Sequence, residues 1–264
     1  MNKIKNKRIK VLEQQFNTIL EILKKEKIVI DSIPPKFDDF SFTSQNKVKS
    51  IEGKPSSISS KMFNTVENYL SVFQNRAYHF FLFDGSLIKL NFEFDESYAL
   101  KTYNLSWLPC VFTSEYINMF EIKDNQMNIF ELYNELDSYE LSSKEKICLS
   151  DICLRSPIRI DFDSTYSDFS RTTHPLTHMH FQSKNTRLKI ENTFCIYRFV
   201  AFVLENCYPD EYFIKKKRKN RGDEDNGFIT DDLFNELKIN KEEYLGNTIK
   251  KWDVESRFSI NINF

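Results

Sequence analysis

The first part of the chain has apolar side chains at helical spacing. Between residues 4 and 24 they recur three and four positions apart, with Lys and Glu between them. Side chains at this spacing lie on one face of a helix, so the pattern predicts an amphipathic helix. The helix is expected to end before Pro34-Pro35, because proline cannot continue it. We therefore expect residues 1–35 to form a separate N-terminal docking helix.

A two-residue pattern follows in the stretch YHFFLFDGSLIKLNFEFD, residues 78–95. Two apolar runs flank Asp84-Gly85, a residue pair that is typical of a tight hairpin turn. From Ile88 to Phe94 apolar and polar residues alternate, which predicts a strand with one buried face. A third strand is expected at residues 101–108. Together these strands predict an antiparallel meander.

The remaining patterns are shorter. They predict helices at residues 61–75, 124–140, 193–207 and 231–238, strands at 155–163, 174–181 and 257–264, and loops at 36–60 and 215–227. An antiparallel sheet with helices packed on it defines the α+β class, which we expect here, with the N-terminal amphipathic helix in addition. Residues 36–210 would form the α+β core, and 211–264 a flexible basic and acidic loop, a short helix and a C-terminal strand.

Composition and charge limit the function. The chain has 264 residues, with 37 basic and 38 acidic side chains and a net charge of −1. A protein that wraps duplex DNA usually has a clear basic excess, so global capture of duplex DNA is not expected. The sequence contains neither G-x-x-x-x-G-K-[ST] nor G-x-G-x-x-G, which excludes nucleotide binding by those phosphate-binding loops.

The apolar residues and the cysteines predict a location. No run of 18 apolar residues occurs, and the basic N-terminus lacks the apolar segment of a signal peptide. The five cysteines form an odd, scattered set, which we interpret as reduced core residues. We therefore expect a soluble, cytoplasmic protein that does not bind a membrane.

Candidate chemistry lies in two of the expected strands. Alternate residues of a strand share a face, so LRSPIRIDFD places two arginines and two aspartates together, and THPLTHMHF places three histidines together. These residues are Arg155, Arg159, Asp161 and Asp163 in the first stretch, and His174, His178 and His180 in the second. If the two strands pair, carboxylates meet imidazoles on one sheet face.

Imidazole and carboxylate together suit zinc, manganese or iron, so His174, His178 and His180 are candidate ligands of a divalent metal. A bound metal could activate water for phosphodiester hydrolysis. The catalytic residues would then be Asp161, Asp163 and His178, and Arg155 and Arg159 would hold the phosphate of the substrate. The alternative is a hydrogen-bonded polar network that only stabilises the sheet.

A basic run near the C-terminus is a candidate contact for nucleic-acid phosphates. It consists of Lys215, Lys216, Lys217, Arg218, Lys219 and Arg221. The acidic residues 223–225 follow at once and partly neutralise it, so a solvated loop is the alternative.

Several motifs taken in order resemble a bacterial family known as domain of unknown function 2290. The similar stretches are FFLFDGSLIKLNFEFD, LSWLPC, RIDFD, HPLTHMHF and FVAFVLENCYP, across residues 75–210. The motif positions are Asp84, Gly85, Ser86, Pro109, Arg159, Asp161, Asp163, His174, Pro175, His178, Tyr208 and Pro209. Residues 186–190 depart from the family pattern. The resemblance implies a component of a bacterial antiviral or anti-plasmid system, and it implies no reaction.

The expected function is a non-catalytic accessory subunit of such a defence complex. It would bind a larger ATPase or nuclease through the N-terminal helix and through exposed aromatic surfaces, as amphipathic helices often bind a groove of a partner. The first alternative is a metal-dependent nuclease or phosphodiesterase that uses the Asp and His cluster. The second is a nucleic-acid-binding module that uses the basic run.

Overall fold

A computed structural model describes residues 6–48, 66–113, 152–153, 155–164, 177–181, 183–190 and 194–208. The helices expected at 124–140 and 231–238, the strand at 257–264 and the basic run at 215–221 lie outside these residues. No described helix has the length and apolar character that a membrane crossing requires.

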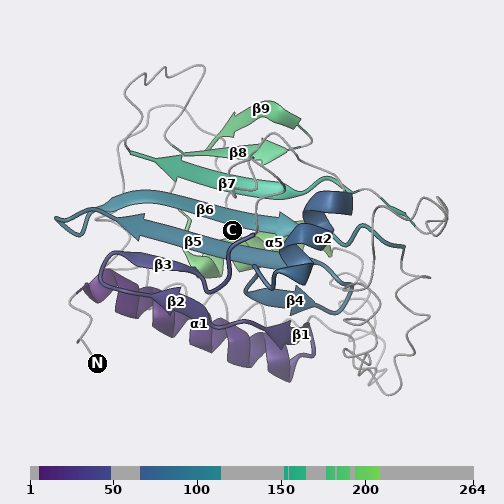
Figure 1. Cartoon of the computed structure of the whole chain (residues 1–264), viewed down its shortest axis with the longest axis horizontal. Coiled ribbons are helices and arrows are strands. Elements are labelled where there is room, and N and C mark those ends of the chain that lie inside the picture. The colour runs from purple at the N-terminus through teal and green to yellow at the C-terminus, as the bar shows by residue number, and fades with distance from the viewer. Residues whose placement is uncertain are drawn as a thin grey trace, which may run out of the picture.

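An antiparallel sheet forms the centre of the molecule (Figure 1). Its neighbouring strands are, in order, β1 (Val29–Ser32), β4 (Phe80–Leu82), β5 (Leu87–Phe94), β6 (Leu100–Leu108), β7 (Ile158–Asp163), β8 (Thr177–Phe181) and β9 (Ser183–Lys189). A short hairpin of β2 (Pro35–Phe37) and β3 (Ser41–Ser44) joins through pairing of β3 with β5. From β4 to β9 the order in the sheet follows the order in the chain, so the expected α+β meander is confirmed.

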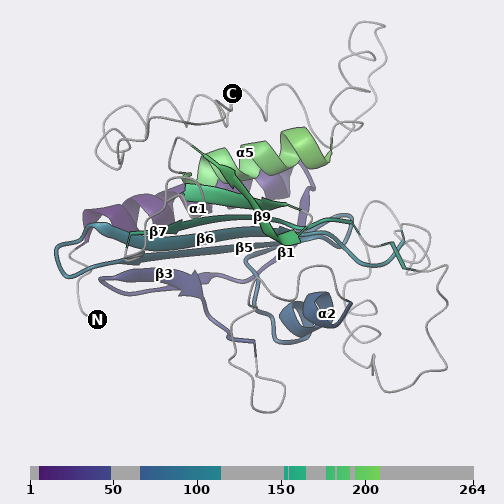
Figure 2. The ribbon, with the colours of Figure 1, turned by 90° about the horizontal axis from the view of Figure 1, so that it is seen from above.

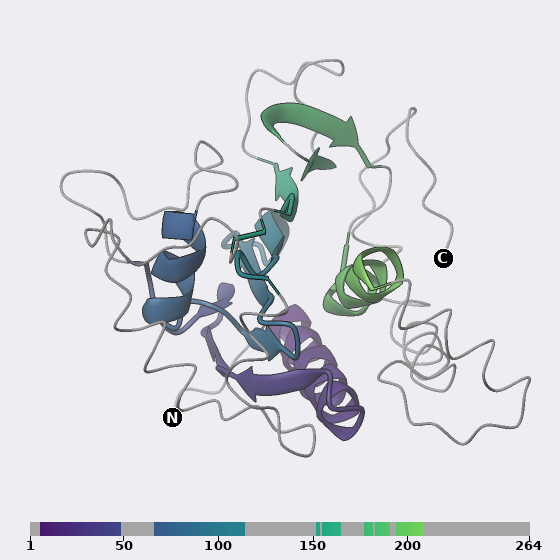
Figure 3. The ribbon, with the colours of Figure 1, turned by 90° about the vertical axis from the view of Figure 1, so that its right-hand side faces the viewer.

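The helices lie on both faces of this sheet (Figures 2 and 3). Helix α1 (Lys7–Lys25) and helix α5 (Ile196–Cys207) cover one face, and α2 (Val66–Gln74) lies on the other. The main apolar core fills the layer between the sheet and the α1/α5 pair. A smaller cluster, which includes Tyr69, Phe73 and Phe81, packs around α2. The rest of the α2-side face is therefore where polar side chains of the strands can gather.

Helix α1 begins with a cap and buries its apolar stripe within the chain. The side chain of Asn6 accepts a hydrogen bond from the Arg8 N–H at 2.9 Å, which satisfies one of the unpaired amides of the first turn. Leu12, Phe16 and Ile19 are 0–2% exposed and belong to the same core as α5. This differs from the expectation of a separate docking piece, because the sheet of the same chain already covers the stripe.

The segment between the N-terminal helix and α2 also differs from the expectation. The loop predicted at 36–60 contains strand β3 and most of strand β2 in its described part. Phe42 is fully buried and pairs with Phe92 of β5. Strands of three and four residues have too few apolar positions to show a period, so pairing with β5, which lies far along the chain, decides their structure.

His79 is a buried histidine beneath α1, and it makes the stability depend on pH. Its Nδ1 accepts a hydrogen bond from the Leu90 N–H at 3.1 Å, and its ring packs against Phe16 and Phe42. Burial, together with the nearby charge of Lys89, lowers the pKa of His79 from 6.5 to about 3. The imidazole is therefore neutral in the folded protein at neutral pH.

Between these two pKa values the unfolded chain holds a proton on His79 that the folded chain does not. The free energy of unfolding should thus fall as the pH falls, by about 2 kcal/mol between pH 7.5 and pH 5. Urea unfolding at both pH values measures this change. His79→Asn keeps an acceptor for the Leu90 N–H but has no group that titrates at this position. Between pH 7.5 and pH 5 its free energy of unfolding should therefore fall less than that of the wild type, by the His79 contribution. Equal losses in the two proteins would contradict the prediction.

Candidate functional site

Strands β7 and β8 pair, and the pairing joins the acidic and histidine stretches. In the register of this antiparallel pair Asp161 lies opposite His178, and Arg159 lies opposite His180. Directly opposed residues of a ladder point to the same face. Ile158, Ile160 and Phe162 are buried in the main core, so Arg159, Asp161 and Asp163 face the other side, away from α1 and α5. The condition for a shared site is therefore met.

The carboxylate of Asp161 is the centre of this site. Its Oδ2 lies 3.2 Å from His180 Nε2 and 3.9 Å from His178 Nε2. The two imidazoles pack edge to face, with ring centroids 4.8 Å apart. His178 is 3% exposed and His180 2% exposed, so both rings are inside the protein. Two buried imidazoles and one partly exposed carboxylate thus converge at this point of the sheet.

Neighbours on β6 and β7 orient this carboxylate. Asn104 Nδ2 donates to Asp161 Oδ1 at 2.6 Å, and Ser106 Oγ donates to Asn104 Oδ1 at 3.0 Å, which fixes the orientation of the amide. Arg159 Nη2 lies 2.6 Å from Asp161 Oδ2. Burial alone would raise the pKa of Asp161, but the hydrogen bond from His180, the charge of Arg159 and the hydrogen bond from Asn104 lower it overall. The carboxylate is therefore ionised at neutral pH.

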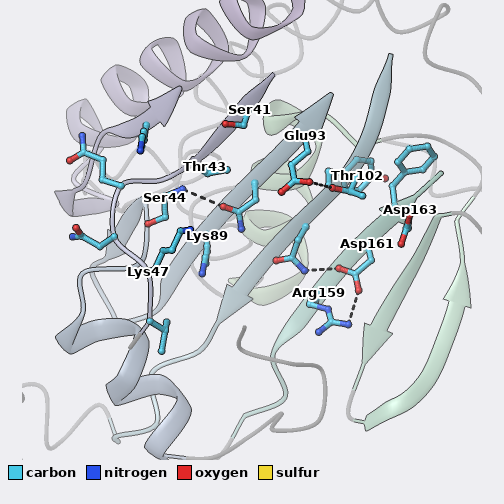
Figure 4. A pocket seen from close by; sticks show the side chains of 18 of the residues that line it. Ser41, Thr43, Ser44, Lys47, Lys89, Glu93, Thr102, Arg159, Asp161 and Asp163 are labelled. Carbon is cyan, nitrogen blue, oxygen red and sulfur yellow. Dashed lines mark hydrogen bonds and ion pairs between the residues drawn. The ribbon is translucent and has the colours of Figure 1, made fainter. Parts of the chain in front are cut away.

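The site belongs to a pocket of about 820 Å³ on the open face of the sheet (Figure 4). The wall on one side comes from β3 and the residues after it, including Lys47, and the floor comes from β5, β6, β7 and β8. This volume lies in the range of pockets that hold small ligands. Asp163, Lys89 and Arg159 line it together with the Asp161 cluster.

Cross-strand register arranges the floor in three rows. The cationic row consists of Lys89, Ser106, Arg159 and His180, which are paired in sequence across β5, β6, β7 and β8. The amide row consists of Asn91, Asn104, Asp161 and His178. The acidic row consists of Glu93, Thr102 and Asp163. Charge therefore changes from positive to negative along the strand direction.

Asp161, His178 and His180 could together hold a divalent metal. Each offers one ligand atom, and these atoms lie within 4.8 Å of one another. Metal–nitrogen and metal–oxygen bonds of about 2.0–2.2 Å require only a small closure of this set. Asn104 holds the other carboxylate oxygen, Oδ1, and Arg159 contacts Oδ2, the oxygen that faces the imidazoles, so both orient the carboxylate as outer contacts of metal ligands commonly do. Three protein ligands would leave a position for water or substrate.

Arg155 is not brought to this site. It precedes β7, and its Nη2 lies 3.1 Å from Asp84 Oδ2 in the turn between β4 and β5. The strand predicted from residue 155 would run through Pro157, but β7 begins only at Ile158. Proline has no N–H for the ladder, so the side-chain parity does not continue past it. Arg155 therefore does not line the pocket, whereas Arg159 does.

Asp84 is instead the centre of a second network. It accepts hydrogen bonds from the Ser86 N–H and Ser86 Oγ, each at 2.9 Å, and from Tyr208 Oη at 3.1 Å. Trp107 Nε1 in turn donates to Tyr208 Oη at 3.2 Å. The guanidinium of Arg155 lies over the Trp107 ring at 5.7 Å. This network ties the β4–β5 turn to the end of α5.

The other expected site residues divide in two. Asp163 lines the same pocket as Asp161 but belongs to the acidic row. His174 and the basic run at 215–221 lie outside the described residues. The sequence did not identify three further residues of the site. Asn104 contacts Asp161, Ser106 supports Asn104, and Lys89 lines the pocket. The sequence pattern that could have identified them is the alternation along β5 and β6, which puts their polar residues on the same sheet face as Asp161.

Comparison with known proteins gives a family and no relative of known activity. A family model described as "Uncharacterized conserved protein (DUF2290)" matches residues 37–256. No curated protein and no solved structure matches the chain. The matched region includes every described residue of the pocket except Lys36.

Proposed function

The chain belongs to the uncharacterised DUF2290 family, and from that premise we propose that it is a metal-dependent phosphodiester hydrolase, with Asp161, His178 and His180 as the metal ligands. One observation carries the proposal. The β7–β8 register brings the Asp161 carboxylate next to two buried imidazoles that contact each other, inside a pocket large enough for a ligand. A purely structural network would not require a pocket beside it.

The side chains around the cluster have separate roles in such a reaction. A metal held here would supply a Lewis acid and a bound water with a pKa near 7. Arg159 lines the pocket and contacts Asp161 through Nη2, so its guanidinium lies where it can also hold a phosphoryl oxygen. Asp163 lies two residues along the same face and supplies a carboxylate that can accept the proton of the attacking water.

The expected role as an accessory subunit of a bacterial defence complex is the competing proposal. Three features supported it: the near-neutral charge, the lack of the two phosphate-binding loops, and the amphipathic N-terminal helix. Burial of Leu12, Phe16 and Ile19 in the core weakens the third of these and leaves the other two. The defence setting itself is compatible with a hydrolase, because the family resemblance implies a context and no reaction.

A metal and activity measurement tests the proposal. Protein treated with a chelator should bind close to one equivalent of Zn²⁺, Mn²⁺ or Fe²⁺ in calorimetry. The reloaded protein should hydrolyse bis(p-nitrophenyl) phosphate, which contains a single phosphodiester. Failure to bind any of the three ions, together with no hydrolysis, would overturn the proposal and favour the non-catalytic accessory role.

A further inference from the structure

We propose that the pocket binds a single-stranded polynucleotide whose backbone crosses the strands along the cationic row, with one phosphate at the Asp161 cluster and a neighbouring phosphate at Lys89. This inference rests on the proposed hydrolase function and names its substrate class. It follows from the cross-strand register, the surroundings of Lys89 and the position of the acidic row.

The register places the two fixed cations of the floor at a defined separation. Lys89 on β5 pairs with Ser106 on β6, and Ser106 pairs with Arg159 on β7. Two strand spacings separate the backbones of the two cations, roughly 9–10 Å. In Figure 4 Lys89 and Arg159 lie on either side of the strand between them. One compact anion at Arg159 therefore leaves Lys89 for a second anionic group of the same ligand.

Lys89 is a cation that the described part of the chain leaves without an acidic partner. Its side chain lines the pocket, and no ion pair to it occurs among the described residues. Burial lowers the pKa of Lys89. A desolvated ammonium is costly unless an anion pairs with it, so the position favours an anionic ligand. Lys47 on the facing wall adds a further positive charge beside it.

The position of the acidic row favours a single-stranded polynucleotide over a duplex. Glu93 and Asp163 line the same pocket on the side away from Lys89 and Arg159, and Asp38 lines the wall. The second strand of a duplex would bring its phosphates toward these carboxylates, which repel them. The imidazoles of the cluster are also only 2–3% exposed, so the reacting phosphate must enter the pocket. A flexible single strand can do this, whereas a paired backbone is held at the duplex surface.

Lys89→Met tests the second phosphate, because it keeps the length of the side chain and removes the charge. We expect the KM for an oligothymidylate of about ten nucleotides to rise about tenfold or more, since a charge-assisted contact is lost. The KM for bis(p-nitrophenyl) phosphate, which has no second phosphate, should rise by a smaller factor than the KM for the oligothymidylate. Lys101→Met removes an exposed lysine that does not line the pocket and should change neither value.

A binding measurement separates the two proposals. In the presence of a chelator, fluorescence anisotropy of labelled oligothymidylate should show binding that Lys89→Met weakens and whose salt slope it reduces by about one. A duplex of the same length should bind more weakly. Equal binding of wild type and Lys89→Met, or preference for the duplex, would overturn the substrate assignment even if the diester is hydrolysed. Lys89-dependent binding without any hydrolysis would support the assignment and overturn the hydrolase.

Discussion

Replacing His178 by alanine should remove the bound metal and lower phosphodiester hydrolysis by at least about 100-fold. Mutation of a residue that only contacts a metal ligand commonly lowers metal affinity or activity by about 10–100-fold. Mutation of a direct ligand should lower them at least as much. His178 Nε2 lies 3.9 Å from Asp161 Oδ2, on the sheet face away from the main apolar core. Loss of this imidazole leaves one imidazole and one carboxylate as ligands. Metal content by mass spectrometry and diester hydrolysis measure the two effects together.

Two further variants guard against a simple loss of folding. His178→Gln keeps a polar side chain at a buried position but is a poor ligand, and it should lose metal in the same way. Met179→Leu changes the next residue of β8, which packs on the apolar side, and should retain metal and activity. Full metal occupancy in folded His178→Ala would show that the imidazole is not a ligand.

Replacing Asp84 by alanine should lower the free energy of unfolding by about 3 kcal/mol. The substitution removes the acceptor of the buried Tyr208 hydroxyl, the ion-pair partner of Arg155 and both hydrogen bonds from Ser86. Arg155 is partly exposed and contributes little of this, because water screens its charge. Most of the loss comes from polar groups that stay buried without partners. Urea unfolding at neutral pH measures it.

The matched variant is Asp84→Asn. It keeps one oxygen and the turn-forming side chain at the hairpin, so it should lose roughly half as much stability. Both variants should still bind metal, because the Asp161 cluster lies in a different network. A similar stability in wild type and Asp84→Ala would mean that the network is dispensable. Loss of metal in Asp84→Asn at full stability would mean that the two networks are coupled.

The spacing of apolar residues was enough to predict an element and its buried face where the same spacing continued along the whole element. Alternation in β5 and β7 placed Lys89, Arg159 and Asp161 on the polar phase of their strands, and the structure keeps them there. The helical stripe of α1 was also correct in its position. What covers that stripe could not be deduced, because a buried face and a docking face have the same spacing of apolar residues.

The site itself required contacts between distant residues. Asn104 and Asp161 are 57 positions apart, and only the β6–β7 register brings the amide to the carboxylate. Alternation fixes which face of β7 is polar, but a shift of two residues would keep that face and place Arg159 or Asp163 opposite Asn104, and nothing in a single strand excludes such a shift. The prediction for Arg155 was wrong for a local reason. It assumed that strand alternation continues across Pro157, where the ladder ends.

The packing of α1 with α5 has a consequence for the order of folding. Phe16 and Phe199 belong to the same core, although nearly the whole described length of the chain separates them. Contacts between such distant residues form slowly, because a long loop must close first. During synthesis the apolar stripe of α1 leaves the ribosome long before α5 exists to enclose it. The part of this apolar surface that α5 covers thus stays open on the nascent chain until α5 emerges, and during this interval we expect a chaperone to bind it.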